Sequence, residues 1–205
     1  MFIFAWYKIE IIIMVLPVVA YGHPMLRQVA QEITADFEGL ESFVESMWDT
    51  MYHTNGVGLA APQVSQSIRI FVVDTLQLVE NFDEDDLAEF PDEEGIKQVF
   101  INPKILSKSG SLWTYNEGCL SIPKVRDDIK REEVVKIEYY DEQFQKHVET
   151  FSGVTGRVIL HEYDHLEGKL FIDYLPPLKK KLVQKKLKDI SKGKVKVDYR
   201  MVFKK

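Results

Sequence analysis

The segment His161-Glu162-Tyr163-Asp164-His165 constrains the fold of this chain more than any other feature. On a helix, two histidines four residues apart lie on one face, one turn from each other, with Glu162 beside them. This arrangement suits a metal ion that is held by two imidazoles next to a carboxylate base. The alternative is a solvated polar helix face without a metal. The chain has only 5 histidines in 205 residues, and this scarcity favours the metal site.

The residues around this motif predict a helix that packs into a core. Val154, Val158 and Ile159 precede the motif, and Leu166 follows it at helical spacing. Gly168 can adopt the left-handed conformation that ends many helices. A site on such a helix would be rigid.

A catalytic divalent ion usually takes three protein ligands, so a third ligand must come from elsewhere. Metzincin proteases place a third histidine six residues after the second, where this chain has Phe171. Thermolysin-like proteases use a later glutamate. Here Glu167 is the last glutamate, and the segment Lys169–Leu175 is predicted to be a strand. Neither protease pattern is complete.

The only cysteine, Cys119, is the remaining soft ligand. A lone cysteine cannot form an intramolecular disulfide, which fits a reducing cytosol. One interpretation is a small buried hydrophobic residue. The other is the third ligand of a Cys1His2 site, which borderline-soft divalent ions accept, with Gly118 permitting a close backbone approach.

A third segment, Gly56–Gln63, has the sequence GVGLAAPQ. An amphipathic helix is predicted before it, ended by Asn55-Gly56. The apolar stripe of that helix consists of Phe37, Leu40, Val44, Met47 and Met51. By itself, a glycine- and alanine-rich turn fits a tight loop between a helix and a strand equally well.

Taken in this order, the three segments resemble those of peptide deformylases, metallohydrolases that remove the N-formyl group from newly made proteins. The resemblance runs from about Val15, through Tyr21-Gly22-His23-Pro24, to about Leu178. It implies that N-formylmethionyl nascent peptides are the substrates, and that the protein is cytoplasmic. We predict neither membrane insertion nor DNA binding.

The resemblance also implies a role for each of nine residues. The metal ligands would be Cys119, His161 and His165; Glu162 would be the general base; Gln63 and the N–H of Leu120 would hold the oxyanion; Val57, Gly58 and Gly118 would line the peptide site. A site walled by Val57, Leu120 and Val158 could accept the methionine side chain.

Three details of the site carry expectations of their own. Arg126 and Glu117 match a family pair near the site rim, and Leu160 stands where relatives commonly carry Gln. The lost hydrogen bond at position 160 would loosen the site mildly. The resemblance implies Fe(II) as the physiological ion, whereas the donor chemistry also admits Zn(II), Ni(II) and Co(II).

Length and composition predict one domain, and the pattern of expected strands and helices predicts the α+β class. With 205 residues and 45% hydrophobic content, the chain can form one sizeable core. We predict a single compact domain with antiparallel sheets around a central helix that carries the His-Glu-x-x-His motif. Strands are expected at residues 68–74, 99–101, 133–140 and 144–151, with a turn at residues 141–143.

We divide the chain into an N-terminal extension (1–13), a catalytic domain (14–178) and a basic tail (179–205). The apolar run Ile11–Ala20 is interrupted by Pro17 and falls short of the ~20 apolar residues that a membrane helix needs. We therefore predict no membrane span, and Met14 is the favoured start of translation.

Two segments carry concentrated charge. Residues 80–94 contain nine Asp and Glu and no Lys or Arg, which predicts a solvated, mobile acidic insertion. From Leu178 to Lys205, twelve Lys or Arg face two Asp. A helix is expected at Leu178–Ile190 and a strand-like segment at Val195–Phe203. This tail is either a solvated face or a contact with ribosomal RNA phosphates.

Two other classes of protein remain as alternatives. An ordinary metalloprotease would need a further ligand, which the sequence lacks. A catalytically silent relative that binds ribosomes would not need every catalytic position, yet all of them are filled.

Overall fold

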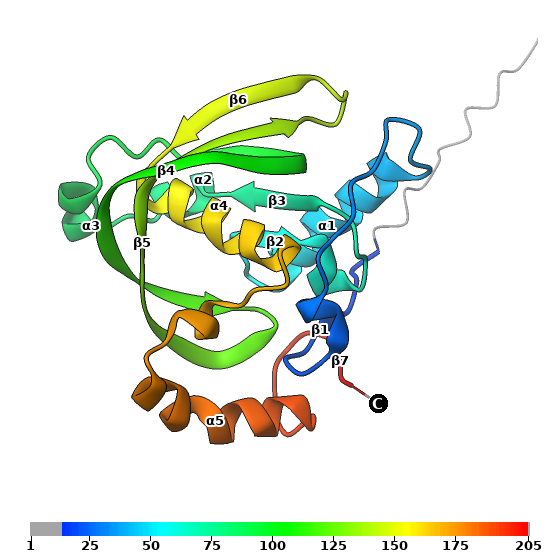
Figure 1. Cartoon of the computed structure of the whole chain (residues 1–205), viewed down its shortest axis with the longest axis vertical. Coiled ribbons are helices and arrows are strands. Elements are labelled where there is room, and N and C mark those ends of the chain that lie inside the picture. Colours follow the sequence, from blue (N-terminus) through cyan, green and yellow to red (C-terminus); the bar gives the residue numbers. More distant parts are fainter. Residues whose placement is uncertain (1–13, 205) are drawn as a thin grey trace, which may run out of the picture.

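The structure is a computed structural model that describes residues 14–204 (Figure 1). The strands are β1 (Val18–Val19), β2 (Gly58–Ala60), β3 (Ile70–Asp74), β4 (Lys97–Cys119), β5 (Ile122–Tyr140), β6 (Lys146–Phe151) and β7 (Met201–Val202). The helices are α1 (Leu40–His53), α2 (Leu76–Val79), α3 (Glu84–Glu89), α4 (Gly153–Leu166) and α5 (Pro177–Ser191). Three short 3-10 helices are η1 (Pro24–Arg27), η2 (Ala61–Val64) and η3 (Phe171–Tyr174).

Five strands form an antiparallel sheet in the order β2-β3-β4-β5-β6. The two long strands, β4 and β5, pair along most of their length, and their register shifts at four places. Such irregularities let paired strands bend, and the two strands curve around α4 (Figure 1). The predicted α+β fold with a central helix is confirmed. The second sheet, β1 with β7, is parallel, unlike the antiparallel sheets that we expected.

The helix α4 is buried along almost its whole length, since twelve of its 14 residues are buried. Val158, Ile159 and Leu160 pack against Phe100 and Tyr139 of the sheet. Burial of each such side chain stabilises the fold by about 1.5–3 kcal/mol. The motif therefore sits on a rigid element, as predicted.

Gly168 lies just beyond the end of α4, as the sequence predicted. It has a positive φ of 66°, and a Cβ there would lie 2.8 Å from the backbone of Arg27. Only glycine fits this position without strain.

The predicted strand at Lys169–Leu175 is wrong, because the structure has the 3-10 helix η3 there. Asp173 accepts a hydrogen bond from the N–H of Leu170 at 2.9 Å and also pairs with Arg27. These contacts close the turn. Phe171 and Ile172 are both buried in this turn.

The sequence underestimated the long strands. The segment at 99–101 is a small part of β4, and the segment at 133–140 is the second half of β5. The outer part of β4 includes Ser107, Ser109 and Gly110, residue types with little intrinsic preference for strands. Their pairing with β5 holds them extended.

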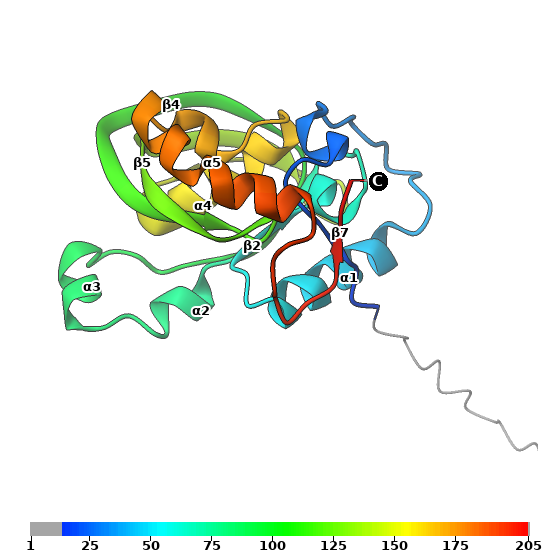
Figure 2. The ribbon, with the colours of Figure 1, turned by 90° about the horizontal axis from the view of Figure 1, so that it is seen from below.

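The acidic segment, residues 80–94, contains a short helix where we expected a solvated, mobile loop. It contains α3, whose N-cap Asp83 accepts hydrogen bonds from the N–H groups of Asp85 and Asp86. Seen from below, α3 projects beyond the rest of the molecule (Figure 2). One residue reaches back: Glu93 accepts a hydrogen bond from the N–H of Val154, at the start of α4, at 2.7 Å.

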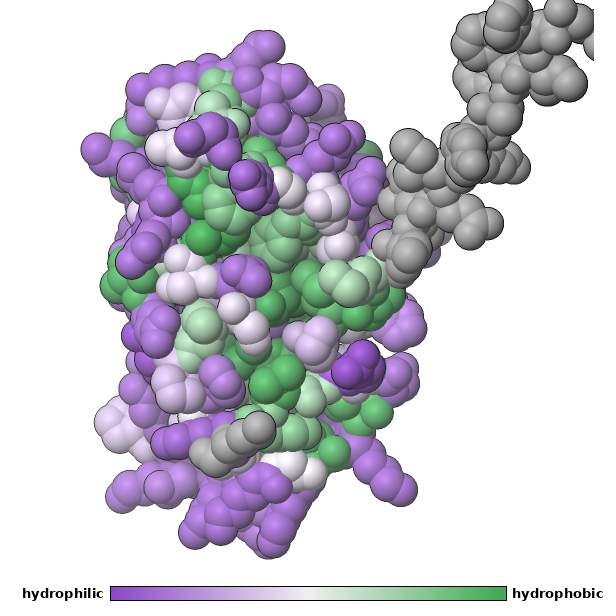
Figure 3. Space-filling model, turned by 90° about the vertical axis from the view of Figure 1, so that its right-hand side faces the viewer, coloured by the Kyte–Doolittle hydropathy of each residue, from purple (hydrophilic) through white to green (hydrophobic). Residues whose placement is uncertain are grey.

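The C-terminal segment begins with α5, as predicted, but only Met201–Val202 of the expected strand at 195–203 is a strand. These residues pair with β1 (Figure 1). The side of the molecule where α1, β1 and β7 lie shows apolar side chains across its middle and mainly polar ones at its ends (Figure 3). Within residues 14–204, no helix has the length and apolar character needed to cross a bilayer. The predicted extension, residues 1–13, lies outside the described residues.

Candidate active site

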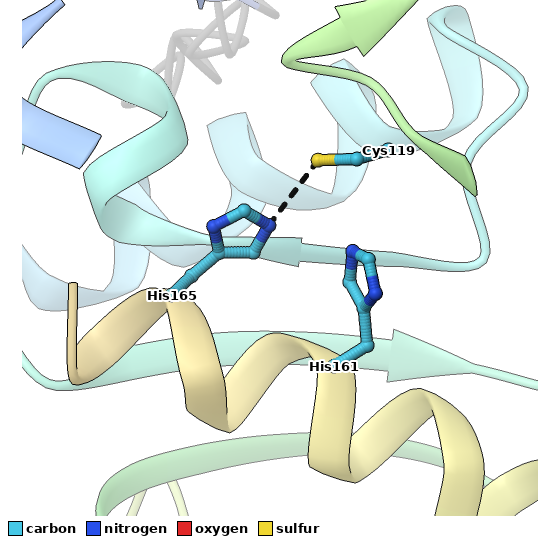
Figure 4. Close-up of side chains that lie close together, drawn as sticks. All are labelled: Cys119, His161 and His165. Atoms are coloured by element: carbon cyan, nitrogen blue, oxygen red, sulfur yellow. Dashed lines mark hydrogen bonds between the residues drawn. The ribbon is translucent and has the colours of Figure 1, made fainter. Parts of the chain in front are cut away.

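The three predicted metal ligands converge. Cys119 is the last residue of β4, and His161 and His165 lie one turn apart on α4 (Figure 4). Their ligand atoms all lie within 4.8 Å of one another, and Cys119 Sγ is 3.3 Å from His165 Nε2. The tight turn between β4 and β5 places the cysteine over the helix.

The donor set fits a borderline-soft divalent ion, since it offers one sulfur and two imidazole nitrogens on buried or half-buried side chains. His161 uses Nδ1 to donate a hydrogen bond to Glu117 Oε2 at 2.9 Å. Its Nε2 is thereby left for the ion. A carboxylate behind a ligating histidine fixes the ring and its tautomer.

Glu117 is the centre of a buried charge network. Arg131 donates two hydrogen bonds to its carboxylate, at 2.7 and 2.9 Å, and Arg157 donates one at 3.1 Å. Arg131 also pairs with Asp164, which lies inside the motif. Burial alone would raise the pKa of Glu117, but the hydrogen bonds from His161 and Arg131 hold its pKa well below the ordinary value.

Glu117 and Arg126, the pair that we placed near the site rim, both line the pocket, but Glu117 lies deeper than we expected. Glu117 is only 4% exposed, whereas Arg126 is exposed and donates to the side chain of Asn116 at 2.8 Å. One signal could have revealed this. Glu117 is two residues before Cys119, so on a strand both side chains point to the same face.

Glu162 lies against the glycine-rich segment Gly56–Gln63. A Cβ at Gly58 would come within 2.7 Å of Glu162 Oε1, so only glycine leaves room for this carboxylate. Burial raises the pKa of Glu162 to about 7, although nearby His161 opposes the shift. Glu162 Oε2 is buried and has no hydrogen-bond partner among the described residues. This carboxylate can exchange a proton near neutral pH.

Gln63 is oriented by the backbone. Its Oε1 accepts a hydrogen bond from the N–H of Ala60 at 2.7 Å. Its Nε2 therefore points the other way and lies 3.5 Å from Cys119 Sγ. The amide thus presents a donor to the centre of the site.

These residues surround a pocket of about 510 Å³. The predicted site residues that line it are Val57, Gly58, Gln63, Glu117, Gly118, Cys119, Leu120, Arg126, Val158, His161 and Glu162. His165 lies deeper, at 1% exposure. Leu160, the residue before the motif, packs into the hydrophobic core. The pocket residues that sequence reasoning missed include Val197 and Tyr199, which come from the C-terminal segment.

A cysteine and a helix-borne histidine pair beside a buried carboxylate, inside a wrapped antiparallel sheet, define a metallohydrolase. The family model for polypeptide deformylase matches residues 15–181. The chain belongs to the peptide deformylase family. Its activity is the removal of the N-formyl group from nascent proteins.

Relatives and solved structures agree with this family. A peptide deformylase from Christiangramia forsetii is 50% identical over 190 residues, covering 93% of this chain and 96% of the relative. One from Flavobacterium johnsoniae is 51% identical over 192 residues, with the same two coverages. A structure from Plasmodium falciparum has a TM-score of 0.74 at 36% identity and covers 86% of this chain and 95% of that one. A Met-Ala-Ser-bound structure from Acinetobacter baumannii has a TM-score of 0.69 at 33% identity and covers 80% and 99%.

Proposed function

We propose that this chain deformylates N-formylmethionyl peptides with Cys119, His161 and His165 as metal ligands and Glu162 as general base. One observation carries the proposal: the buried Glu162 carboxylate has an oxygen without a hydrogen-bond partner among the described residues, next to the three converging ligands. A divalent ion bound there would lower the pKa of water from about 15.7 to about 7 and so supply a hydroxide at neutral pH.

Glu162 then moves the proton. A carboxylate whose pKa lies near 7 can accept the proton of the attacking water and return it to the leaving amine. The formyl carbon gains a bond to oxygen, the C–N bond breaks, and formate leaves. Because burial shields Glu162 from bulk water, the proton stays within the site.

Gln63 and the N–H of Leu120 would stabilise the negative charge that develops on the formyl oxygen. The Gln63 amide is already held by the backbone of Ala60, so it needs no reorganisation during the reaction. A single donor of this kind typically lowers the barrier by about 2.7–4 kcal/mol.

The methionine side chain would occupy the apolar part of the pocket. Val57, Leu120 and Val158 wall it, together with the backbone of Gly58 and Gly118. An unbranched thioether fits such a site by shape and by apolar burial. The Acinetobacter baumannii relative binds Met-Ala-Ser, which supports the same class of substrate here.

We further propose Fe(II) as the physiological ion and a cytoplasmic location, with residues 14–178 as the catalytic unit. The thiolate and imidazole donors also accept Zn(II), Ni(II) and Co(II), so availability would decide which ion is bound. The basic α5 would contact ribosomal RNA, since its exposed lysines can bind phosphates without reading sequence.

Cys119→Ser tests the metal site. A hydroxyl is a harder ligand than a thiolate and stays mostly protonated, so metal affinity and activity on formyl-Met-Ala-Ser should both fall strongly. Metal analysis of protein purified without oxygen, paired with this assay, gives the measurement. If the variant keeps stoichiometric metal and an unchanged Co(II) absorption spectrum, Cys119 is not a ligand.

A further inference from the structure

The C-terminal segment returns to the active site after α5. The hydroxyl of Tyr199 donates a hydrogen bond to the carbonyl oxygen of Leu120 at 2.8 Å. The side chains of Tyr199 and Val197 also line the substrate pocket. The family model ends at residue 181, so both residues lie beyond the part of the chain that it matches.

The turn between β4 and β5 is held at two successive carbonyl groups. Tyr199 binds the carbonyl of Leu120, and the N–H of Tyr21 donates to the carbonyl of Ser121 at 2.8 Å. The two segments that supply these donors are joined by the pairing of β1 with β7 (Figure 1). The backbone that follows Cys119 is therefore braced by both terminal segments.

This bracing acts on the backbone of Leu120, which follows the proposed metal ligand Cys119. The carbonyl and the N–H of Leu120 belong to adjacent peptide groups, so fixing the carbonyl restricts the rotation that would turn the N–H away from the pocket. We propose that Tyr199 is a positioning residue: it aims the Leu120 N–H at the formyl oxygen and, with Val197, closes one wall of the substrate pocket. The inference rests on the proposed role of Leu120 in holding the oxyanion.

The size of the effect follows from two limits. Loss of one neutral hydrogen bond costs about 0.5–1.5 kcal/mol, which is about a 2- to 13-fold change. Complete loss of an oxyanion donor lowers kcat by about 10²- to 10³-fold. The decrease in kcat caused by a donor that is present but poorly aimed should lie between these two values.

Tyr199→Phe removes the hydroxyl and keeps the ring. With formyl-Met-Ala-Ser, kcat per bound metal should fall about 10- to 100-fold, while KM changes less than about twofold. Metal content, apo-protein Tm and the Kd of the product peptide Met-Ala-Ser should stay near wild type, because the product has no formyl oxygen. Tyr199→Leu also removes the wall, so it should additionally raise KM and the Kd of Met-Ala-Ser. Tyr140→Phe is the matched control, since Tyr140 does not line the pocket.

Two results would overturn the inference. The first is a Tyr199→Phe enzyme with kcat within twofold of the control. The second is a loss of activity that follows metal content or the unfolded fraction, since that would show a structural role only. Failure of the proposed function looks different: the wild type would lack deformylase activity, or Gln63→Ala, which removes the other oxyanion donor, would retain wild-type kcat.

Discussion

Acidic side chains occupy two contrasting regions of this protein. Glu117, Glu162 and Asp164 are buried at the sheet and helix that form the site. The nine acids of residues 80–94 are mostly exposed, on a segment that projects from the body (Figure 2). Buried charges are costly unless they are paired or have a use, whereas exposed charges cost little. Burial, rather than the density of charge along the sequence, distinguishes the acids of the site from the other acids.

The largest effect should come from Glu162, a buried acid that forms no ion pair among residues 14–204. Glu162→Gln keeps the shape but cannot accept a proton at neutral pH, so kcat should fall about 10²- to 10⁴-fold while the metal stays bound. Metal analysis and turnover of formyl-Met-Ala-Ser are the measurements. Glu84→Gln, on exposed α3, is the control. Near wild-type turnover in Glu162→Gln would remove Glu162 from the mechanism.

Replacement of Glu117 should lower both the stability of the protein and its affinity for the metal. Glu117→Ala leaves Arg131 and Arg157 buried without this partner, which should destabilise the protein by about 3–5 kcal/mol. Because His161 also loses its hydrogen bond, metal affinity should fall about 10- to 100-fold. Urea unfolding and metal titration check these effects, with Glu89→Ala as the exposed control. Wild-type stability in Glu117→Ala would contradict the network.

Much of the site was predictable from local sequence. The periodicity of α4 and the spacing of its histidines predicted a buried helix that carries a metal motif, and Cys119 was the only soft ligand left. The structure brings these residues together; their roles stay predictions. The pairing of Glu117 with His161 and of Tyr199 with Leu120 joins residues 44 and 79 positions apart. Such contacts are created by the path of the chain, which no local pattern encodes.

Glu93 links the two regions, since it is the one acid of the projecting segment that binds the motif helix. Its carboxylate accepts from the N–H of Val154 and from the hydroxyl of Thr155, at 2.7 and 2.5 Å. Glu93→Gln removes the charge from the positive end of α4 and should destabilise the protein by about 0.5–2 kcal/mol. Thermal unfolding compared with Glu94→Gln, an exposed neighbour, measures this. Equal Tm values would show that the cap contributes nothing.

The smallest effect on catalysis should come from replacing the exposed lysines of α5, a basic region that contrasts with the acidic segment. Lys179 pairs with Asp127, and Lys180 donates to the carbonyl of Asp173, so these two lysines have structural contacts. The remaining exposed lysines of this region are free for replacement by Gln: Lys181, Lys185, Lys186, Lys188 and Lys192. Turnover of a short free peptide should stay within about twofold, because none of them lines the pocket.

Ribosome binding should respond differently if α5 contacts RNA. Each phosphate contact that is lost lowers the slope of log affinity against log salt by roughly 0.7–0.9, so the Gln variant should sediment with ribosomes less and with a shallower salt dependence. Replacement of the same lysines by Arg keeps the charge and should preserve binding. Wild-type protein that does not sediment at low salt, or a Gln variant that binds like the Arg variant, would leave α5 as a solvated face. In that case the exposed lysines of α5, like the exposed acids of residues 80–94, would have no role in function, unlike the buried charges of the site.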